Sequence, residues 1–246
     1  MRIAYENKFD SAIITSSGEN IEYPLINLKD QRLCMPFEYS ASSVSIYVDL
    51  GAVKPVGTLA VLGHNLSSAA TVIFTAYVTS DYLLPPDFTQ SCTWNEGMIL
   101  SFVSSQNYQY WKIDIEDAWA SKISIGRIWM GEYITISPSS LLDFKITKKR
   151  SDRNIYGINR QKWGLEGVGW RKFELSFPDS ASDMIELIRA MFVSVGKHTS
   201  FIFCNFDTIR DYKIVQPCYV SIANDLVLNH SSRMRFKYNL VMEEER

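Results

Sequence analysis

Four side chains suited to ligand contact lie in polar segments of the first half of the chain: His64, Asn65, Trp94 and Trp119. The imidazole and carboxamide of the first two can hydrogen-bond a sugar hydroxyl or a partner's backbone. The two indole rings can stack on a sugar face, or they can anchor a contact between domains or subunits. The segment GHNLSS also fits a tight turn in which Asn65 and Ser67 bond their own backbone. These four residues are therefore candidate ligand contacts, with turn capping and interface anchoring as the alternatives.

A basic segment with interleaved aromatic residues covers residues 145–172, where nine Lys or Arg stand against Asp152 and Glu166. Cationic side chains neutralise phosphate and aromatic rings stack on bases, so nucleic-acid binding is one reading. The glycines of the segment fit better with a long hairpin that reaches the acidic surface of a neighbouring subunit. A solvated charged loop is the remaining alternative. The candidate subunit-interface residues are Lys148, Lys149, Arg150, Arg153, Tyr156, Arg160 and Trp163.

Catalytic chemistry finds little support in the sequence. Asp114, Glu116 and Asp117 follow a strand alternation, which puts the first two on one solvent-side face, whereas glycoside hydrolysis needs carboxylates that converge across a cleft. The chain contains no GxSxG, no HExxH and no glycine-rich phosphate loop. We therefore expect no enzymatic activity and no cofactor.

The cysteines and histidines are too scattered to propose a metal site. No two cysteines have the CxxC spacing, and the three histidines do not cluster with them. Free, buried thiols are the expectation for Cys34, Cys92, Cys204 and Cys218.

The composition is that of a soluble globular chain, with 46% hydrophobic and 21% charged residues among 246. No run approaches the roughly 18 apolar residues of a membrane span, and the start MRIAYENKFD lacks the features of a secretory signal, so we expect synthesis in a cytoplasm. Residues 1–140 hold eight basic and 14 acidic residues (−6), whereas 141–246 hold 17 and 13 (+4), giving the net charge of −2. This asymmetry predicts two domains, 1–140 and 141–246.

The first of these domains carries successive short apolar segments with strand-forming composition. SIYVDLG, TLAVLGHNL and TVIFTAYVTSD are separated by turn signals at Gly51, Gly63 and Asp81, and MILSFV, YQYWKIDIED and SKISIGRIWMGEYITI follow a polar excursion from Leu84 to Gly97. Short strands at intervals of about ten residues are typical of an all-β sandwich.

The second domain is organised around one amphipathic helix, expected at about 181–195. A sharp turn at Pro178 precedes it, Ser180 and Asp183 resemble a capping box, and Gly196 can adopt the left-handed conformation that ends a helix. One broad apolar face is formed by Met184, Ile185, Leu187, Ile188, Met191, Phe192 and Val195. Strands are expected on both sides of it, at 173–177, 201–207, 212–220 and 234–242. The prediction is a small antiparallel sheet or barrel closed by one helix.

The order of strands in residues 20–137 resembles the discoidin or galactose-binding-like jelly roll. The resemblance rests on a VDLG strand that leads into an apolar strand, on FTAYVTSD, on YQYWKIDIED, and on the closing strand ISIGRIWMGE. It implies a jelly-roll sandwich; many members of that fold bind sugars or lipids through loops at one end, and many serve as spacers.

Residues 145–245 resemble the tail-tube-like belt module of bacteriophage distal tail and related minor tail proteins. The likeness is carried by a strand, a helix of about four turns ending in glycine, an aromatic strand and further strands. Together the two resemblances imply a structural protein of the distal-tail or tail-tip class, located in the virion tail and assembled in the host cytoplasm. They imply a ring of copies, a hexamer or trimer, next to tail-tube and tail-tip proteins, with the sandwich displayed outward. Binding of host-surface glycans is the alternative function; a membrane or a specific nucleic-acid partner is not expected.

Overall fold

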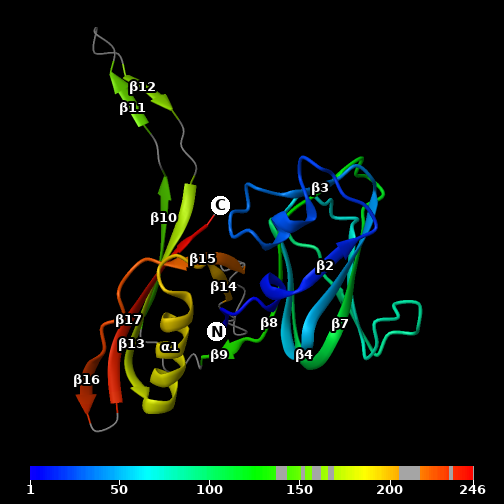
Figure 1. Ribbon diagram of the computed structural model, residues 1–246. Helices are drawn as coiled ribbons and strands as arrows, with labels where there is room; N and C mark the ends of the chain where they lie inside the picture. The colour runs from blue at the N-terminus through cyan, green and yellow to red at the C-terminus, as the bar shows by residue number, and fades with distance from the viewer. Residues whose placement is uncertain are drawn as a thin grey trace.

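The computed structural model describes residues 1–136, 143–150, 153–156, 162–165, 169–204, 217–232 and 235–245. These residues form two large antiparallel sheets, a separate two-stranded ribbon and one α-helix (Figure 1). The predicted fold class is confirmed: the chain is mainly β, with a β-sandwich and an antiparallel sheet closed by one helix. Within the described residues no helix is long and apolar enough to cross a membrane.

The sandwich is built from seven strands hydrogen-bonded in the order β3-β8-β4-β7-β5-β6, with β2 paired to β4. Their bounds are β2 Ile13–Ser16, β3 Phe37–Tyr39, β4 Ser43–His64, β5 Thr71–Tyr77, β6 Phe88–Cys92, β7 Met98–Glu116 and β8 Ile123–Gly131. Two short 3-10 helices, Lys8–Ser11 and Leu25–Lys29, precede β3. The polar excursion 84–97 contains β6, a strand that the sequence analysis did not predict.

β4 and β7 are paired over almost their whole length and pass from one layer of the sandwich into the other. The ladder runs from Ser43 opposite Glu116 to Leu62 opposite Met98, with register shifts between 49 and 54 and between 56 and 58. Bulges of this kind bend a strand, and Gly51 there has a φ of +75°. The segments predicted as separate strands on either side of Gly51 are therefore one bent strand, and the same holds for the two segments of β7.

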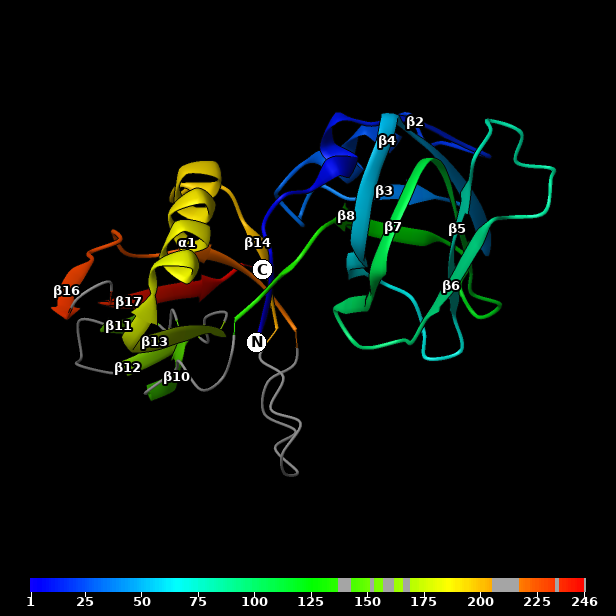
Figure 2. The ribbon, with the colours of Figure 1, turned by 90° about the horizontal axis from the view of Figure 1, so that it is seen from below.

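The bend divides the sandwich into two layers. The first half of β4 joins β2, the second half of β7, β5 and β6, which we call the outer layer. The second half of β4 joins β8 and the first half of β7, which we call the inner layer. Figure 2 shows the inner layer facing the rest of the molecule and β5 and β6 on the far side. Between the layers lies an apolar core that includes Trp111, Phe74, Ile46, Phe37 and Ile128.

The second unit is an eight-stranded sheet in the order β10-β13-β17-β15-β14-β1-β9, with β16 paired to β17. The bounds are β1 Arg2–Ala4, β9 Ile134–Thr135, β10 Asp143–Arg150, β13 Gly169–Ala181, β14 Phe201–Cys204, β15 Cys218–Ile222, β16 Asn229–Ser232 and β17 Arg235–Glu244. The paired strands β10 and β13 extend away from the body toward the ribbon of β11 (Arg153–Tyr156) and β12 (Lys162–Leu165), as Figure 1 shows. We call β10 and β13 the stem.

The helix α1 (Ser182–Val195) lies where the sequence predicts it, and Gly196 ends it with a φ of +59°. Its buried face comprises Ile185, Ile188, Met191 and Val195, whereas the predicted member Leu187 is 42% exposed. The predicted turn at Pro178 is wrong, because β13 continues through a bulge between Phe177 and Ser180 to Ala181. The predicted capping side chains Ser180 and Asp183, like residues 205–216, lie outside what the structure describes.

The division of sheets does not fall at residue 140. β1 at the start of the chain pairs with β14, with Ile3 opposite Phe203, and on its other side with β9. Both β1 and β9 thus belong to the sheet of the second unit, and the sandwich is inserted between them. Charge asymmetry locates a change in composition, but it cannot detect three residues that pair with a strand two hundred positions away.

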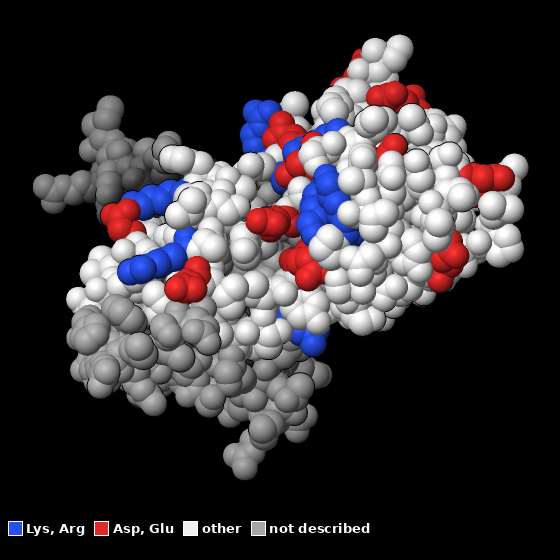
Figure 3. Space-filling view, turned by 60° about the horizontal axis from the view of Figure 1, so that its bottom comes forward, with Lys and Arg blue, Asp and Glu red and all other residues white. Residues whose placement is uncertain are grey.

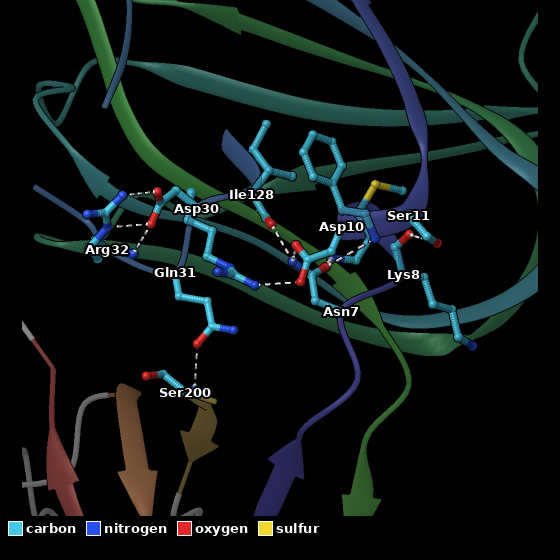
Figure 4. Close-up of polar contacts among 12 residues, drawn as sticks. Asn7, Lys8, Asp10, Ser11, Asp30, Gln31, Arg32, Ile128 and Ser200 are labelled. Carbon is cyan, nitrogen blue, oxygen red and sulfur yellow. Dashed lines mark hydrogen bonds and ion pairs between the residues drawn. The ribbon is translucent and has the colours of Figure 1, made fainter. Parts of the chain in front are cut away.

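The two units share one apolar core. Ala60, Leu62, Met98 and Trp129 of the inner layer pack in the same cluster as the buried face of α1. Beside them Arg127, which is 0% exposed, donates from Nη2 to Asp10 Oδ2 at 2.6 Å, and its guanidinium lies 5.9 Å from the ring of Tyr219 on β15. In Figure 4 Asp10 lies beside Asn7, and Gln31 reaches the backbone N–H of Ser200 across the junction.

We expect Asp10→Ala to lower the free energy of unfolding by about 3–5 kcal/mol, because it leaves a buried guanidinium without its carboxylate. The matched control is Asp225→Ala, which removes an ion pair to Lys197 whose side chains are 81% and 48% exposed and which should cost about 0–1 kcal/mol. Urea unfolding at neutral pH measures both. Equal small losses for the two variants would contradict the structural role of the Asp10–Arg127 pair.

Candidate functional site

Three connections meet at one end of the sandwich and carry the four candidate ligand residues. His64 and Asn65 follow from the end of β4, Trp94 lies between β6 and β7, and Trp119 lies between β7 and β8. The structure brings these segments together through hydrogen bonds among them. Which of the side chains remain available for a ligand depends on those bonds.

Both ring nitrogens of His64 are engaged inside the protein. The backbone N–H of Leu66 donates to Nδ1 at 3.2 Å, and Nε2 lies 3.1 Å from the carbonyl oxygen of Asn95. With Nδ1 accepting, Nε2 must carry the proton and donate. Burial lowers the pKa of His64, while the bond to Asn95 opposes the shift. The imidazole therefore joins two connections as a neutral group.

Asn65 is likewise used internally. Its Nδ2 donates to the carbonyl of Lys122 at 2.8 Å, and its Oδ1 accepts the N–H of Ser124 at 2.8 Å. The carboxamide thus continues the edge of β8 as a backbone group would. Turn formation by Ser67, the alternative given above, is seen in the bond from the N–H of Ala69 to Ser67 Oγ at 3.3 Å.

The two tryptophans differ completely in their surroundings. Trp94 donates from Nε1 to the carbonyl of Leu66 at 3.0 Å and packs against the sandwich core. Trp119 is 82% exposed, while its backbone N–H is held by Asp117 Oδ1 at 3.1 Å. Asn65 and Trp119 are both exposed, but the carboxamide of Asn65 is occupied by the hydrogen bonds given above, so Trp119 is the better placed of the two to contact a ligand.

Asp117 organises this end of the sandwich. Its carboxylate, 1% exposed, accepts the N–H of Ser67 at 2.6 Å, the hydroxyl of Ser67 at 2.8 Å and the N–H of Trp119. Burial raises the pKa of such a carboxyl, but these hydrogen bonds outweigh it, so the pKa of Asp117 is lowered. The sequence signal was its position just past the end of a strand, where an Asp caps the following turn.

The candidate interface residues lie on and beyond the stem. Lys149 pairs with Glu243 of β17 at 2.8 Å, and the neighbouring Arg171 of β13 forms a two-pronged pair with Glu244, at 2.7 and 3.0 Å. Lys148 is exposed, and Arg150 lies at the far end of β10. Arg153 and Tyr156 are in β11 and Trp163 is in β12, of which only the backbone is described, and Arg160 lies outside the described residues.

An open cleft of about 1150 Å³ separates the stem from the sandwich. Its stem side is basic, with Lys148, Lys149, Arg150 and Arg171, and the sandwich side contributes Leu33, Cys34 and Glu96. The charges of the two walls are therefore mixed, and Arg171 is already neutralised by Glu244.

The described residues contain no group of three or more His, Cys, Asp or Glu side chains that could hold a metal ion. All four cysteines are free thiols, and burial raises the pKa of Cys92 and Cys218 to about 12 and of Cys204 to about 11. Cys34 departs from the prediction because it is exposed.

No protein-family model and no curated protein sequence matches this chain. Among solved structures, chitosan-binding module 1 from a chitosanase/glucanase of Paenibacillus sp. IK-5 is similar at 13% identity and a TM-score of 0.42, over 52% of this chain and 99% of that one. A fucose binding module of Streptococcus pneumoniae is similar at 14% identity, with a TM-score of 0.42 and coverage of 52% and 99%. A Ruminococcus gnavus GH29 fucosidase is similar at 15% identity, with a TM-score of 0.44 and coverage of 52% and 27%. Each likeness covers about half of this chain.

We expect Asp117→Asn to destabilise the protein by about 1–3 kcal/mol at neutral pH, because an amide cannot accept all three hydrogen bonds. Because the pKa of Asp117 is lower in the folded than in the unfolded protein, its carboxylate stabilises the fold at pH values above the unfolded pKa of 3.8. This stabilisation is lost as the pH falls below that pKa. The gap between the variant and the unaltered protein should therefore shrink below about pH 4 in urea titrations. The exposed Glu116→Gln is the control; a pH-independent gap for Asp117→Asn would contradict the assignment.

Proposed function

We propose that the protein is a structural subunit that assembles with copies of itself through the second unit and presents the sandwich away from that contact. Following the resemblance of residues 145–245, the assembly is a ring of six or three copies in a bacteriophage tail or tail tip. Tail-tube and tail-tip proteins are then the neighbours of the ring.

The observation that carries the proposal is the free edge of the stem. β10 pairs with β13 over all eight of its residues, from Asp143 opposite Ser176 to Arg150 opposite Gly169, and it is the last strand on that side of the described sheet. The N–H and C=O groups along its outer edge are therefore available to a strand of another chain. Figure 1 shows the stem standing clear of the sandwich, with the β11–β12 ribbon beyond it.

Charge decides which strand or surface can meet this edge. Lys145 and Lys148 are exposed on β10, and lysines on an edge oppose indiscriminate strand pairing. An acidic partner surface removes that penalty, so the surface of the next copy that meets this edge should carry carboxylates. On the face drawn in Figure 3 the acidic side chains lie scattered over the sandwich, so no single acidic patch fixes the contact there.

We expect light scattering of the purified protein to show a discrete oligomer whose fraction rises with protein concentration. The fraction should fall at high salt, because salt screens exposed charges over about 10 Å at 0.1 M. Lys145→Glu/Lys148→Glu should shift the distribution toward the monomer. Lys54→Glu, a charge reversal on the sandwich, is the matched control and should leave the oligomer unchanged. An oligomer that survives the double reversal would argue against the stem edge as the contact.

Glycan binding by the sandwich is the second candidate function, and it can coexist with the structural role. The observation that favours it is Trp119, whose ring is 82% exposed while its backbone is fixed by Asp117. An exposed indole on a backbone that is fixed in this way offers an apolar face to a sugar ring, and only its two side-chain torsions need to be ordered on binding.

We expect the protein to be retained by some members of a panel of immobilised bacterial polysaccharides, and Trp119→Ala to alter that retention if the loop end takes part. The thermal midpoint of Trp119→Ala should equal that of the unaltered protein, because an exposed ring buries little surface. The absence of retention on every polysaccharide tested would sink the glycan-binding candidate and leave the assembly proposal untouched.

A further inference from the structure

A groove lies on the outer layer, on the face that points away from the sandwich core. Its shape and lining are those of a ligand site. It encloses about 460 Å³ between β2, β4 and the connection from β5 to β6, a volume within the range of small-molecule sites. Its lining combines aromatic, hydroxyl and carboxylate side chains: Ile13, Thr15, Tyr47, Asp49, Ser80, Asp81, Tyr82 and Leu83. In Figure 2 the connection after β5 projects on the side farthest from the second unit.

Strand alternation explains why these side chains share a face. In β4 the residues Ile46, Val48 and Leu50 point into the core, so Tyr47 and Asp49 point outward. Cross-strand pairing then aligns Thr15 of β2 opposite Tyr47. The outward face of this layer thus brings Tyr47, Asp49 and Thr15 together beside the exposed Ile13.

Tyr82 forms one wall of the groove by folding back onto the sheet. Its ring centroid lies 4.9 Å from that of Tyr47 and 5.4 Å from that of Tyr77, and its hydroxyl donates to the carbonyl of Val48 at 3.5 Å. Burial, and after it the nearby Asp49, raises the pKa of Tyr82 to about 12, so the phenol stays neutral. The wall is therefore held in place without a ligand.

Hydrogen bonds close the base of the connection from β5 to β6. Asp87 Oδ2 accepts the N–H of Val78 at 2.9 Å, and the N–H of Asp87 donates to the carbonyl oxygen of Ala76 at 3.0 Å. Asp81 Oδ1 accepts the N–H of Leu83 at 3.0 Å, which turns the chain at the tip. The groove is thus preformed, which reduces the ordering cost of binding.

The groove carries negative charge and no lining cation. Asp49 Oδ1 accepts both the N–H of Gly51 at 2.7 Å and Gln109 Nε2 at 2.8 Å, which fixes the carboxylate and leaves Oδ2 for a ligand donor. Asp81 adds a second carboxylate, whereas Lys112, whose Nζ lies 6.0 Å from the centroid of the Tyr47 ring, is paired with Asp114 at 2.9 Å. Such a lining attracts hydroxyl and ammonium donors and repels anions.

We propose that this groove binds a saccharide that carries no negative charge, with amine-bearing sugars preferred. The sugar face lies against Tyr47 and Tyr82, and its hydroxyl or ammonium groups donate to Asp49 and Asp81. The proposal rests on glycan binding as the second candidate function, and it places the ligand on the sheet face, far from the loop end that carries Trp119.

The test is titration calorimetry of the full chain with three probes: a glucosamine oligosaccharide, a neutral mannan oligosaccharide and an acidic galacturonate oligosaccharide. We expect the first to bind most tightly and the acidic probe to give no heat of binding. Ser80→Trp, which fills the groove from an exposed position, and Tyr82→Ala should each weaken binding at least tenfold. Asp49→Asn should abolish the preference for the amine over the neutral probe, while Glu96→Gln, a substitution at an exposed position of the loop end, should change affinity less than twofold.

Four results would overturn the proposal. Undiminished binding by both Ser80→Trp and Tyr82→Ala excludes the groove, and loss of binding in Trp119→Ala moves the ligand to the loop end while glycan binding itself stands. Preference for the acidic probe contradicts the charge argument. Absence of binding to all three probes at millimolar concentration removes this groove proposal, and the polysaccharide panel then decides whether the sandwich binds any glycan. Circular dichroism of each variant separates a lost ligand contact from a lost fold.

Discussion

Burial of the inner layer on both faces is the constraint on which the rest of the structure depends. In the second half of β4, Leu59 and Val61 face the sandwich core, whereas Ala60 and Leu62 face the second unit and pack in its core. An inner layer without the second unit would expose that second set of apolar side chains to water, at about 25 cal/mol for each Å² uncovered. The two units therefore stabilise each other. The buried Arg127 of β8 lies at the same contact between them.

That constraint leaves the two ends of the molecule free for contacts. The outer layer has no covering unit in the described chain, so its outward face can hold polar and aromatic side chains such as Tyr47 and Asp49. The stem leaves the body on the other side, with the edge of β10 unpaired in the described sheet. Display of the sandwich and assembly through the stem are thus compatible, because they use surfaces that do not overlap.

The loop end of the sandwich shows how internal hydrogen bonds compete with ligand binding. His64 and Asn65 are the residue types that contact sugars, yet each is fully used in joining one connection to the next. The same chemistry serves both purposes, since a carboxamide satisfies a strand edge as readily as a sugar hydroxyl. Internal hydrogen bonding separates the two roles, since Asn65 is exposed yet occupied, and it leaves Trp119 as the better placed side chain at this end.

The sequence by itself determined the mainly β character, the position of α1 and its end at Gly196, because these follow from local periodicity and from one glycine in a left-handed conformation. Tertiary structure alone decided that β4 is a single bent strand, that β1 belongs to the far sheet, and that Tyr82 folds onto Tyr47. A glycine with a positive φ fits a bulge as well as a turn, so it does not distinguish the two. A strand of three residues is too short to show a periodic pattern. These features depend on segments that are distant in sequence. Burial against those segments decides which conformation and which pairing form, and no local pattern encodes that burial.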